Sequence, residues 1–279
     1  MNSMKTIKMV NGAALLLSIP FLIVAFGCKD NSVGSGSTLT IDSKLDLSIT
    51  EQLNDSARYV VLHAQTERLY ATPCYSMDYS QVLNGNALSF TFQDVSLQDT
   101  ACPSVATPAM VNVNLGLLPI GYYTLTVTVN GMSVQGQLQV TDSSYILRNA
   151  SGQWTNVADS LIFKVPVGAI WGSVAYNDPQ VGGSAKDRFF SSLDSLGAVD
   201  HVYPAGTYSL FTINSSGTIV LAQGNSLYFD PVVRQYLGST QNIRAIVEAY
   251  AVAYYPYLNI NLYTWDGNYF QSSALYGGS

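Results

Sequence analysis

Apolar and polar residues alternate with a period of two along much of the chain between Thr38 and Thr141. The alternation is clearest at Leu45–Ile49, Leu88–Phe92 and Val111–Leu115. Successive side chains of a β-strand point to opposite faces of the sheet, so such runs bury one face and leave the other in water. No amphipathic helix pattern lies between these runs. We therefore predict a mainly β fold with a β-sandwich over 38–142.

The end of this region carries two more specific patterns. Tyr123–Val129 and Met132–Val140 are joined by Asn130-Gly131, a dipeptide suited to the positive φ angles of a hairpin turn. The residues Leu117-Leu-Pro-Ile-Gly-Tyr-Tyr123 have the Leu-x-Pro-x-x-x-Tyr spacing of a tyrosine corner. The segment therefore resembles the closing strands of immunoglobulin-like or fibronectin-type-III-like domains of bacterial surface proteins. The resemblance implies an immunoglobulin-like sandwich.

The N-terminal residues predict export. Lys5 and Lys8 precede an apolar run over Ala13–Phe26 that contains Pro20. A membrane span needs about 20 apolar residues, so this shorter, interrupted run fits the apolar region of a secretory signal better. We expect a signal peptide over 1–27.

The residues at the end of that run resemble a bacterial lipobox. In Ala25-Phe26-Gly27-Cys28 a small residue comes directly before a cysteine. The resemblance implies cleavage before Cys28 and lipidation of that residue, which would anchor the chain in the membrane. An ordinary signal peptide with an incidental cysteine is the alternative. Residues 28–37 are rich in Gly and Ser and predict a flexible tether.

The charged pair Lys29 and Asp30 follows the lipobox directly. This placement resembles the surface-export signal of Bacteroidota lipoproteins. It implies a bacterial envelope protein that is lipid-anchored in the outer membrane and exposed at the cell surface. Once Cys28 is lipidated, Cys74 and Cys102 remain as an even pair in an oxidising compartment, which predicts a disulfide. Two buried free thiols are the alternative.

After a linker expected over 143–159, we predict a second β-rich domain over 160–279 that contains one or two short helices. Ser184 and Asp187 are spaced to cap a helix that ends at Gly197. Asp230-Pro231 predicts a second helix of about two turns, closed by Gly238.

Two other segments of this domain are interpreted as strands. Ile243–Tyr255 combines alanines with Val, Ile and Tyr, and we interpret it as a strand like its alternating successor Leu258–Leu262. A strand is also expected over Tyr208–Ile213. Upstream of it, Pro204-Ala-Gly-Thr-Tyr208 repeats the Pro-x-Gly-x-Tyr spacing of Pro119–Tyr123.

Charge excludes one class of partner and disfavours acid–base chemistry. Only 11% of the residues are charged, against about 25% in a typical domain, and the net charge is −6. A nucleic-acid-binding protein needs a basic face, so we expect no nucleic-acid partner. His63 is expected to be an ordinary strand residue, and the adjacency of Asp200 and His201 does not predict a catalytic triad. We expect no enzymatic activity and no cofactor.

We expect no metal site either. Asp99, Asp178 and Asp266 lie in segments that turn chemistry explains as well as metal binding does, and none has the spaced ligands of a known calcium loop.

Aromatic residues are concentrated between Tyr250 and Phe270. Exposed Tyr and Trp side chains form contact surfaces for proteins and stack on sugar rings. The candidate binding surface consists of five of them: Tyr254, Tyr257, Tyr263, Trp265 and Tyr269. Cross-strand packing inside a charge-poor β domain is the alternative.

These expectations lead to a cell-envelope lipoprotein with a non-catalytic binding, adhesion or structural role. A glycan-binding surface lipoprotein of a polysaccharide uptake system is the second hypothesis, and a hydrolase of unfamiliar type is the third. An exposed row of Tyr263, Trp265 and Tyr269 would favour the glycan. A flat apolar patch would favour a protein partner, and a cleft with two converging acids would favour the enzyme.

Overall fold

Alternate residues of the N-terminal strands pack their Leu, Val and Phe side chains into one core. The computed structural model describes residues 38–54, 57–99, 101–221 and 227–272. The described chain is mainly β, as predicted, and contains two helices. The expected signal peptide 1–27, the lipidated Cys28 and the tether 28–37 lie outside these residues.

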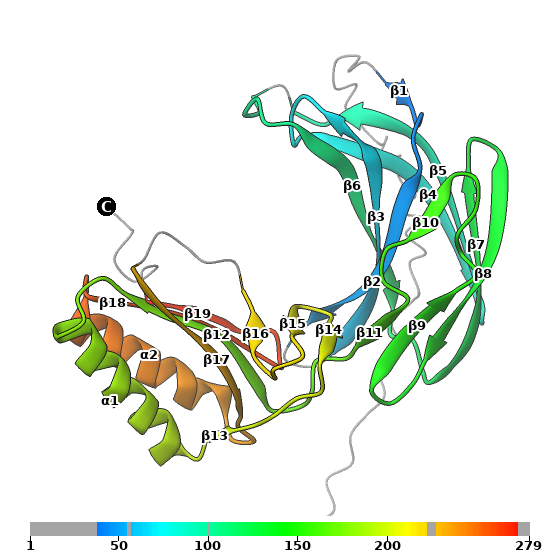
Figure 1. The fold of residues 1–279 in the computed structure, drawn as a ribbon. Helices are drawn as coiled ribbons and strands as arrows, with labels where there is room; N and C mark the ends of the chain where they lie inside the picture. Colours follow the sequence, from blue (N-terminus) through cyan, green and yellow to red (C-terminus); the bar gives the residue numbers. More distant parts are fainter. Residues whose placement is uncertain (1–37, 55–56, 100, 222–226, 273–279) are drawn as a thin grey trace, which may run out of the picture. The chain divides into compact units, whose positions relative to one another are not determined.

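Two layers of strands enclose the N-terminal core and form a sandwich (Figure 1). Both layers belong to one continuous sheet, whose order runs β10-β2-β3-β6-β4-β5-β7-β8-β9 before it continues toward β11, and β6 is joined to β4 at Ser76 and Met110. Most neighbours are antiparallel, but β5 pairs with β7, β2 with β10, and β4 with β6 in parallel. The strands are β1 (Leu39–Thr40), which pairs with β5, β2 (Leu45–Leu53), β3 (Arg58–Tyr70), β4 (Tyr75–Asn84), β5 (Ala87–Leu97), β6 (Thr107–Gly116), β7 (Gly121–Val129), β8 (Met132–Val140), β9 (Ser144–Arg148) and β10 (Thr155–Val157).

The local patterns noted in the sequence take the expected geometry. Asn130 and Gly131 have φ angles of 51° and 75° and join β7 to β8. The hydroxyl of Tyr123 donates a hydrogen bond to the carbonyl oxygen of Pro119 at 2.8 Å. The repeated spacing in the second half makes the same contact, since the Tyr208 hydroxyl donates to the Pro204 carbonyl at 3.0 Å.

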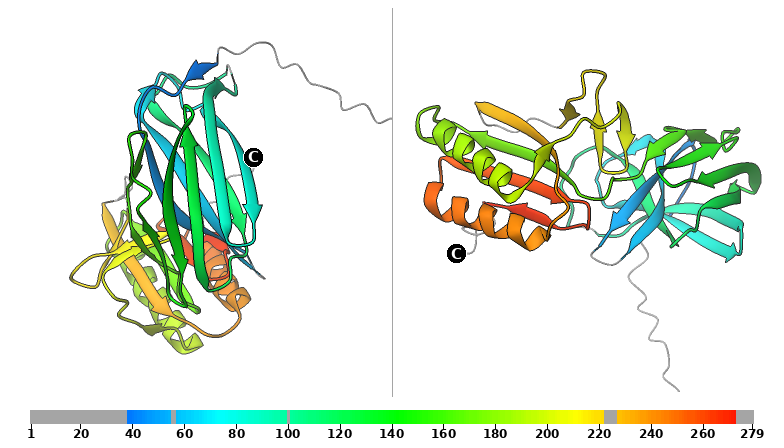
Figure 2. Two further views of the ribbon diagram at one scale, coloured as in Figure 1. Left: turned by 90° about the vertical axis from the view of Figure 1, so that its right-hand side faces the viewer. Right: turned by 90° about the horizontal axis from the view of Figure 1, so that it is seen from below.

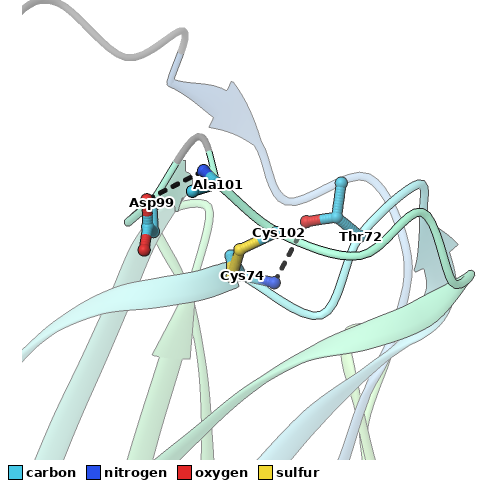
Figure 3. Close-up of a disulfide and its surroundings, with 5 residues drawn as sticks. All are labelled: Thr72, Cys74, Asp99, Ala101 and Cys102. Atoms are coloured by element: carbon cyan, nitrogen blue, oxygen red, sulfur yellow. Dashed lines mark hydrogen bonds between the residues drawn. A yellow bond between two sulfur atoms is a disulfide. The ribbon is translucent and has the colours of Figure 1, made fainter.

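The predicted disulfide between Cys74 and Cys102 is formed (Figure 3). It joins the segment before β4 to the loop that follows β5, and the two Cα atoms lie 6.2 Å apart. Asp99, one of the turn residues considered for calcium, accepts a hydrogen bond from the backbone N–H of Ala101 in this loop. Its carboxylate therefore shapes a turn beside the disulfide.

The segment 143–159, expected as a linker, instead contributes two strands. β9 pairs with β8, and β10 pairs with β2 at one edge of the sheet. From β9 the pairing continues through β11 (Leu161–Phe163) to a small antiparallel group, β14 (Gly206–Tyr208), β15 (Phe211–Ile213) and β16 (Ile219–Val220). The single strand expected over Tyr208–Ile213 is thus a hairpin that reverses at Ser209-Leu210.

A second sheet has the order β13-β17-β12-β18-β19, with every neighbouring pair antiparallel. Along the chain its elements alternate as β12, α1, β13, β17, α2 and β18, which is the ferredoxin-like split β-α-β arrangement with β14–β16 inserted and β19 added. Both helices pack on one face of this sheet (Figures 1 and 2). The bounds are β12 (Ala169–Tyr176), α1 (Val181–Leu196), β13 (Val199–Asp200), β17 (Tyr228–Gln235), α2 (Thr240–Tyr254), β18 (Leu258–Thr264) and β19 (Tyr269–Gln271).

The prediction of a strand over Ile243–Tyr255 was wrong, because this segment is most of α2. Its buried side chains are Thr240, Ile243, Val247 and Ala251, a spacing of three and four residues that places them on one helical face. Packing of that face against the sheet outweighs the strand preference of Val, Ile and Tyr.

The helix predicted from Asp230-Pro231 to Gly238 was also wrong, since Tyr228–Gln235 is β17. Proline lacks a backbone N–H and occurs in sheets only where that donor is not needed. Pro231 lies opposite Ser173 of β12, while β13 pairs only with the far end of β17, at Arg234 and Gln235. The other side of Pro231 therefore has no partner strand among the described residues.

The first predicted helix is confirmed, but it begins three residues earlier than Ser184. Asp178 caps it, because Oδ1 accepts hydrogen bonds from the backbone N–H groups of Gln180 and Val181 at 2.8 and 2.9 Å. Gly182 allows this start, since a Cβ there would lie 2.7 Å from the Tyr257 carbonyl oxygen. Gly197, with a φ of 94°, ends the helix as predicted.

Asp266 connects the start of α2 to the turn between β18 and β19. Its carboxylate accepts hydrogen bonds from the hydroxyls of Thr240, at 2.7 Å, and Thr264, at 2.6 Å. Burial alone would raise the pKa of this carboxyl, but hydrogen bonds from Thr264, Thr240 and Asn268 outweigh it and lower the pKa below 3.8. Asp266 thus joins the start of α2 to the turn after β18.

We expect Asp266→Asn to lower the free energy of unfolding at neutral pH by about 1 kcal/mol, the typical value of a hydrogen bond. Because the folded-state pKa is depressed, this contribution is present above the unfolded pKa and is lost as the pH falls through the folded pKa. Urea unfolding of both proteins between pH 7 and pH 2 should show the difference shrinking below about pH 4. A difference that stays constant across this range would contradict the assignment.

Candidate ligand-binding site

Two of the five candidate aromatics, Tyr263 and Tyr269, lie side by side on the sheet face opposite the helices. They are cross-strand partners in β18 and β19, with ring centroids 4.5 Å apart and planes 23° apart. Their exposed fractions are 41% and 44%. Tyr263 also stacks on Trp171 of β12 at 5.8 Å and 14°, and Trp171 itself is buried. The result is a continuous stack of three rings with half of its tyrosine surface exposed.

The other three candidates lie elsewhere, so the row of Tyr263, Trp265 and Tyr269 does not form. Trp265 packs against a buried cluster around Trp171 and Phe211. Tyr254 packs on the helix side of the sheet, where its hydroxyl accepts a hydrogen bond from Arg188 at 3.1 Å. Tyr257 is exposed and lines a separate small cavity of about 180 Å³.

The aromatic stack forms one wall of a cavity of about 490 Å³, which we call the aromatic cavity. Ligand cavities in proteins usually measure about 300–1,000 Å³. The facing wall comes from the sandwich strands β2, β3 and β6. The lining residues are Thr50, Glu51, Gln52, Leu53, Val61, Asn112, Trp171, Leu210, Tyr263, Thr264, Gly267, Asn268 and Tyr269.

Direct contacts hold the two walls of the aromatic cavity together. The Thr50 hydroxyl donates a hydrogen bond to the carbonyl oxygen of Ser209 at 2.8 Å. Gly267, in the turn between β18 and β19, approaches Leu53 so closely that a Cβ would lie 2.3 Å from its carbonyl oxygen. With a φ of 84°, this position also has a backbone conformation that favours glycine. The walls therefore form a preorganised site.

The polar groups of the cavity are amides and hydroxyls. Gln52 and Thr50 come from the outer face of β2, and Asn112 comes from β6. The side-chain oxygen of Asn112 lies 2.8 Å from Nδ1 of His63. Amides offer both donors and acceptors, so this wall can donate hydrogen bonds to the hydroxyl groups of a ligand and also accept hydrogen bonds from them.

Glu51 is the one acidic or basic residue among those lining the aromatic cavity, and it is only 2% exposed. Its Oε1 accepts a hydrogen bond from the Tyr145 hydroxyl at 2.9 Å, and its Oε2 accepts one from the Val165 N–H at 2.8 Å. Burial, followed by the charge of Glu51, strongly raises the pKa of Tyr145. Nη1 of Arg58 lies 3.8 Å from Glu51 Oε1. Both carboxylate oxygens are thus occupied by protein donors, and the cavity surface is neutral.

The histidines considered for catalysis have other contacts. His63 lies in β3 beside Asn112, as expected of a strand residue. His201 is exposed and packs on the ring of Tyr203 at 4.4 Å, while the neighbouring Asp200 carboxylate lies 3.3 Å from Nε of Arg234. Across the described parts of the chain, no three His, Cys, Asp or Glu residues are grouped as a metal site would require.

Sequence reasoning located Tyr263 and Tyr269 but missed the other wall. Thr50 and Gln52 belong to an alternating run whose outer face is polar, which is the ordinary pattern of a solvent-facing strand. Trp171 lies about ninety residues before Tyr263, and only the pairing of β12 with β18 places them side by side. No local signal in the sequence indicates either contact.

No protein-family model, curated protein or solved structure matches this chain. Neither α1 nor α2, the helices found in the described ranges, has the length and apolar character needed to cross a membrane.

We expect Glu51→Ala to lower the free energy of unfolding by about 3 kcal/mol, because it leaves Arg58 and two buried donors without their partner. Glu51→Gln should cost about 1 kcal/mol, since the amide oxygen keeps one hydrogen bond. Urea denaturation measures both values. Glu67→Ala is the control, because Glu67 is exposed in the neighbouring strand and its loss should change stability by less than about 0.5 kcal/mol. Equal effects at Glu51 and Glu67 would contradict a structural role for the buried carboxylate.

Proposed function

We propose that this chain is a lipid-anchored, non-catalytic binding protein of the bacterial envelope, and that the aromatic cavity binds a glycan. The observation that carries the proposal is the pair of stacked, half-exposed tyrosines facing amide and hydroxyl groups across a neutral cavity. Of the binding, adhesion and structural roles expected from the sequence, a cavity of this kind favours binding.

The chemistry of a sugar ring matches these walls. One face of a pyranose presents C–H groups, which pack on the faces of aromatic rings such as Tyr263 and Tyr269. Its hydroxyl groups both donate and accept hydrogen bonds, as do the side chains of Gln52, Asn112 and Thr50. Glu51, the only charged residue of the lining, is buried, and each of its oxygens accepts a hydrogen bond from the protein. Binding of an uncharged sugar therefore removes water from no exposed ion.

The shape of the site favours a glycan over a protein partner. Surfaces that bind proteins are typically exposed apolar patches of several hundred Å². Tyr263 and Tyr269 lie instead at a hollow whose facing wall carries the polar side chains of Thr50, Gln52 and Asn112 among apolar ones. The acid content disfavours glycoside hydrolysis, which uses two carboxyl groups flanking the scissile bond, because the lining includes Glu51 alone.

The proposal also includes the lipid anchor at Cys28 and an immunoglobulin-like relationship of the N-terminal sandwich. Lipidation at Cys28 would hold the folded residues at the outer membrane through the tether 28–37. The hydrogen bond from Tyr123 to Pro119 supports an immunoglobulin-like relationship, since such a corner is typical of these domains. In immunoglobulin domains the strand that carries the tyrosine corner is the sixth, and it neighbours the third strand. Here the strand that carries the corner is β7, and it neighbours β5. The proposed relationship therefore concerns architecture rather than strand order.

We expect the mature chain to bind a neutral glycan on a glycan array, and Tyr263→Ala and Tyr269→Ala each to weaken that binding by about tenfold through lost stacking. Isothermal titration calorimetry with the best array ligand measures the change, and thermal melting checks that each variant is folded. Tyr257→Ala is the matched control, because Tyr257 is equally exposed but lies outside the aromatic cavity. Loss of affinity in all three variants alike, or binding only to a protein in an envelope pull-down, would contradict the glycan site.

Lipidation has its own test. Cells that express the full chain should incorporate a clickable palmitate analogue into it, and Cys28→Ala should abolish the label while Cys74→Ala in the same experiment leaves it in place. A labelled Cys28→Ala protein, or an unlabelled wild type, would contradict the anchor.

A further inference from the structure

A second cavity, which we call the cationic cavity, lies beside the segment that connects β11 to β12. Its volume is about 340 Å³, and it shares no lining residue with the aromatic cavity. Phe163, Tyr203 and Tyr208 supply aromatic walls. Arg58 and Lys164 also line it, which is notable in a chain with only 12 basic residues. Asp142, an exposed residue, is the one acid of the lining.

Arg58 is incompletely paired. Its Nη1 donates a hydrogen bond to the Val165 carbonyl, and the carboxylate of Glu51 is 3.8 Å from the same nitrogen. The other terminal nitrogen, Nη2, is buried and has no hydrogen-bond partner in the described structure. The guanidinium therefore keeps an unused donor.

Lys164 also lacks a carboxylate partner. Its ammonium lies over the ring of Tyr145, 5.1 Å from the centroid, and it takes part in none of the ion pairs found between described residues. Burial is the main cause that lowers the pKa of Lys164, and repulsion from Arg58 lowers it further, against the opposing attraction of Glu51 and Asp142. Lys164 is thus a partly buried cation with no ion pair of its own, placed beside the cavity.

Tyr203 adds a third unused polar group. The residue is 4% exposed, and its hydroxyl has no hydrogen-bond partner within the described ranges. Burying a hydroxyl without a partner costs about 1–3 kcal/mol, so a ligand that accepts a hydrogen bond from it would recover that loss.

We infer that the cationic cavity binds a small organic carboxylate with a ring-shaped or apolar body. The carboxylate would accept hydrogen bonds from the unused donor of Arg58, from Lys164 and from Tyr203, and charge-assisted bonds of this kind are strong. The body of the ligand would lie against Phe163 and Tyr208, whose rings are 5.2 Å apart. This site is independent of the proposed glycan site.

Titration calorimetry on the full-length chain in detergent tests the inference with benzoate as the probe. Benzamide has the same shape without the charge, and inorganic phosphate has the charge without the ring, so each should bind at least about tenfold more weakly than benzoate. Absence of benzoate binding, or equal binding of benzamide, would overturn the inference. Tighter binding of phosphate than of benzoate would show that the cavity prefers an inorganic anion, and this result would also overturn the inference.

Variants locate the site. Lys164→Gln and Tyr203→Phe should each weaken benzoate binding by about tenfold, while Tyr263→Ala in the aromatic cavity should leave it unchanged. Tyr203→Phe removes a buried hydroxyl that has no partner, so its melting temperature should equal or exceed that of the wild type, and lost binding would not reflect unfolding. Unchanged benzoate affinity in both cavity variants would overturn the assignment. Because the glycan assay uses a different probe, failure of either proposal leaves the other testable.

Discussion

The buried carboxylate of Glu51 connects three parts of the chain that are far apart in sequence. It lies near the end of β2, and its two donors belong to β9 and to the segment before β12. A buried charge costs several kcal/mol unless it is hydrogen-bonded, so these contacts must form together. Its neighbours Thr50, Gln52 and Leu53 line the aromatic cavity, whereas Val165 and Arg58 line the cationic cavity. One ion therefore positions the walls of both cavities.

The second sheet explains why two tyrosines remain exposed. On its helix-facing side, residues of the sheet pack into one core with α1 and α2. The opposite side is covered only in part, by a cluster that includes Trp171, Phe211 from the inserted strands and Leu53 from β2. Tyr263 and Tyr269 lie where this cover ends. Their exposure follows from the insertion of β14–β16 and from the position of β2, and it does not arise from the strand sequence alone.

Several turns and caps were predictable from local residues, and tertiary packing was not. The Asn130-Gly131 turn and the cap at Gly197 depend on backbone angles that neighbouring residues determine, and both were found as expected. Ile243–Tyr255 was misassigned because its strand-favouring side chains are compatible with helix once a sheet covers one face. The donors of Glu51 are separated from it by 94 and 114 residues. No pattern within a short window can indicate such partners, so the sequence indicated the tyrosines of the site without the wall that faces them.

Charged residues are scarce in this chain, and this scarcity affects which ligands each of the two cavities can select. Neutral amides and hydroxyls lose less hydration free energy than ions when a ligand displaces water, so the aromatic cavity suits a ligand that is itself neutral and rich in hydroxyls. In the cationic cavity Arg58 keeps one buried donor unused although Glu51 lies beside its other terminal nitrogen, and Lys164 has no ion pair among the described residues. A ligand carboxylate would give both groups the hydrogen-bond acceptor that the protein does not supply. On these proposals the two cavities select ligands by opposite means: the aromatic cavity offers an ion no exposed charge to pair with, whereas the cationic cavity offers an anion the donors that the protein leaves unused.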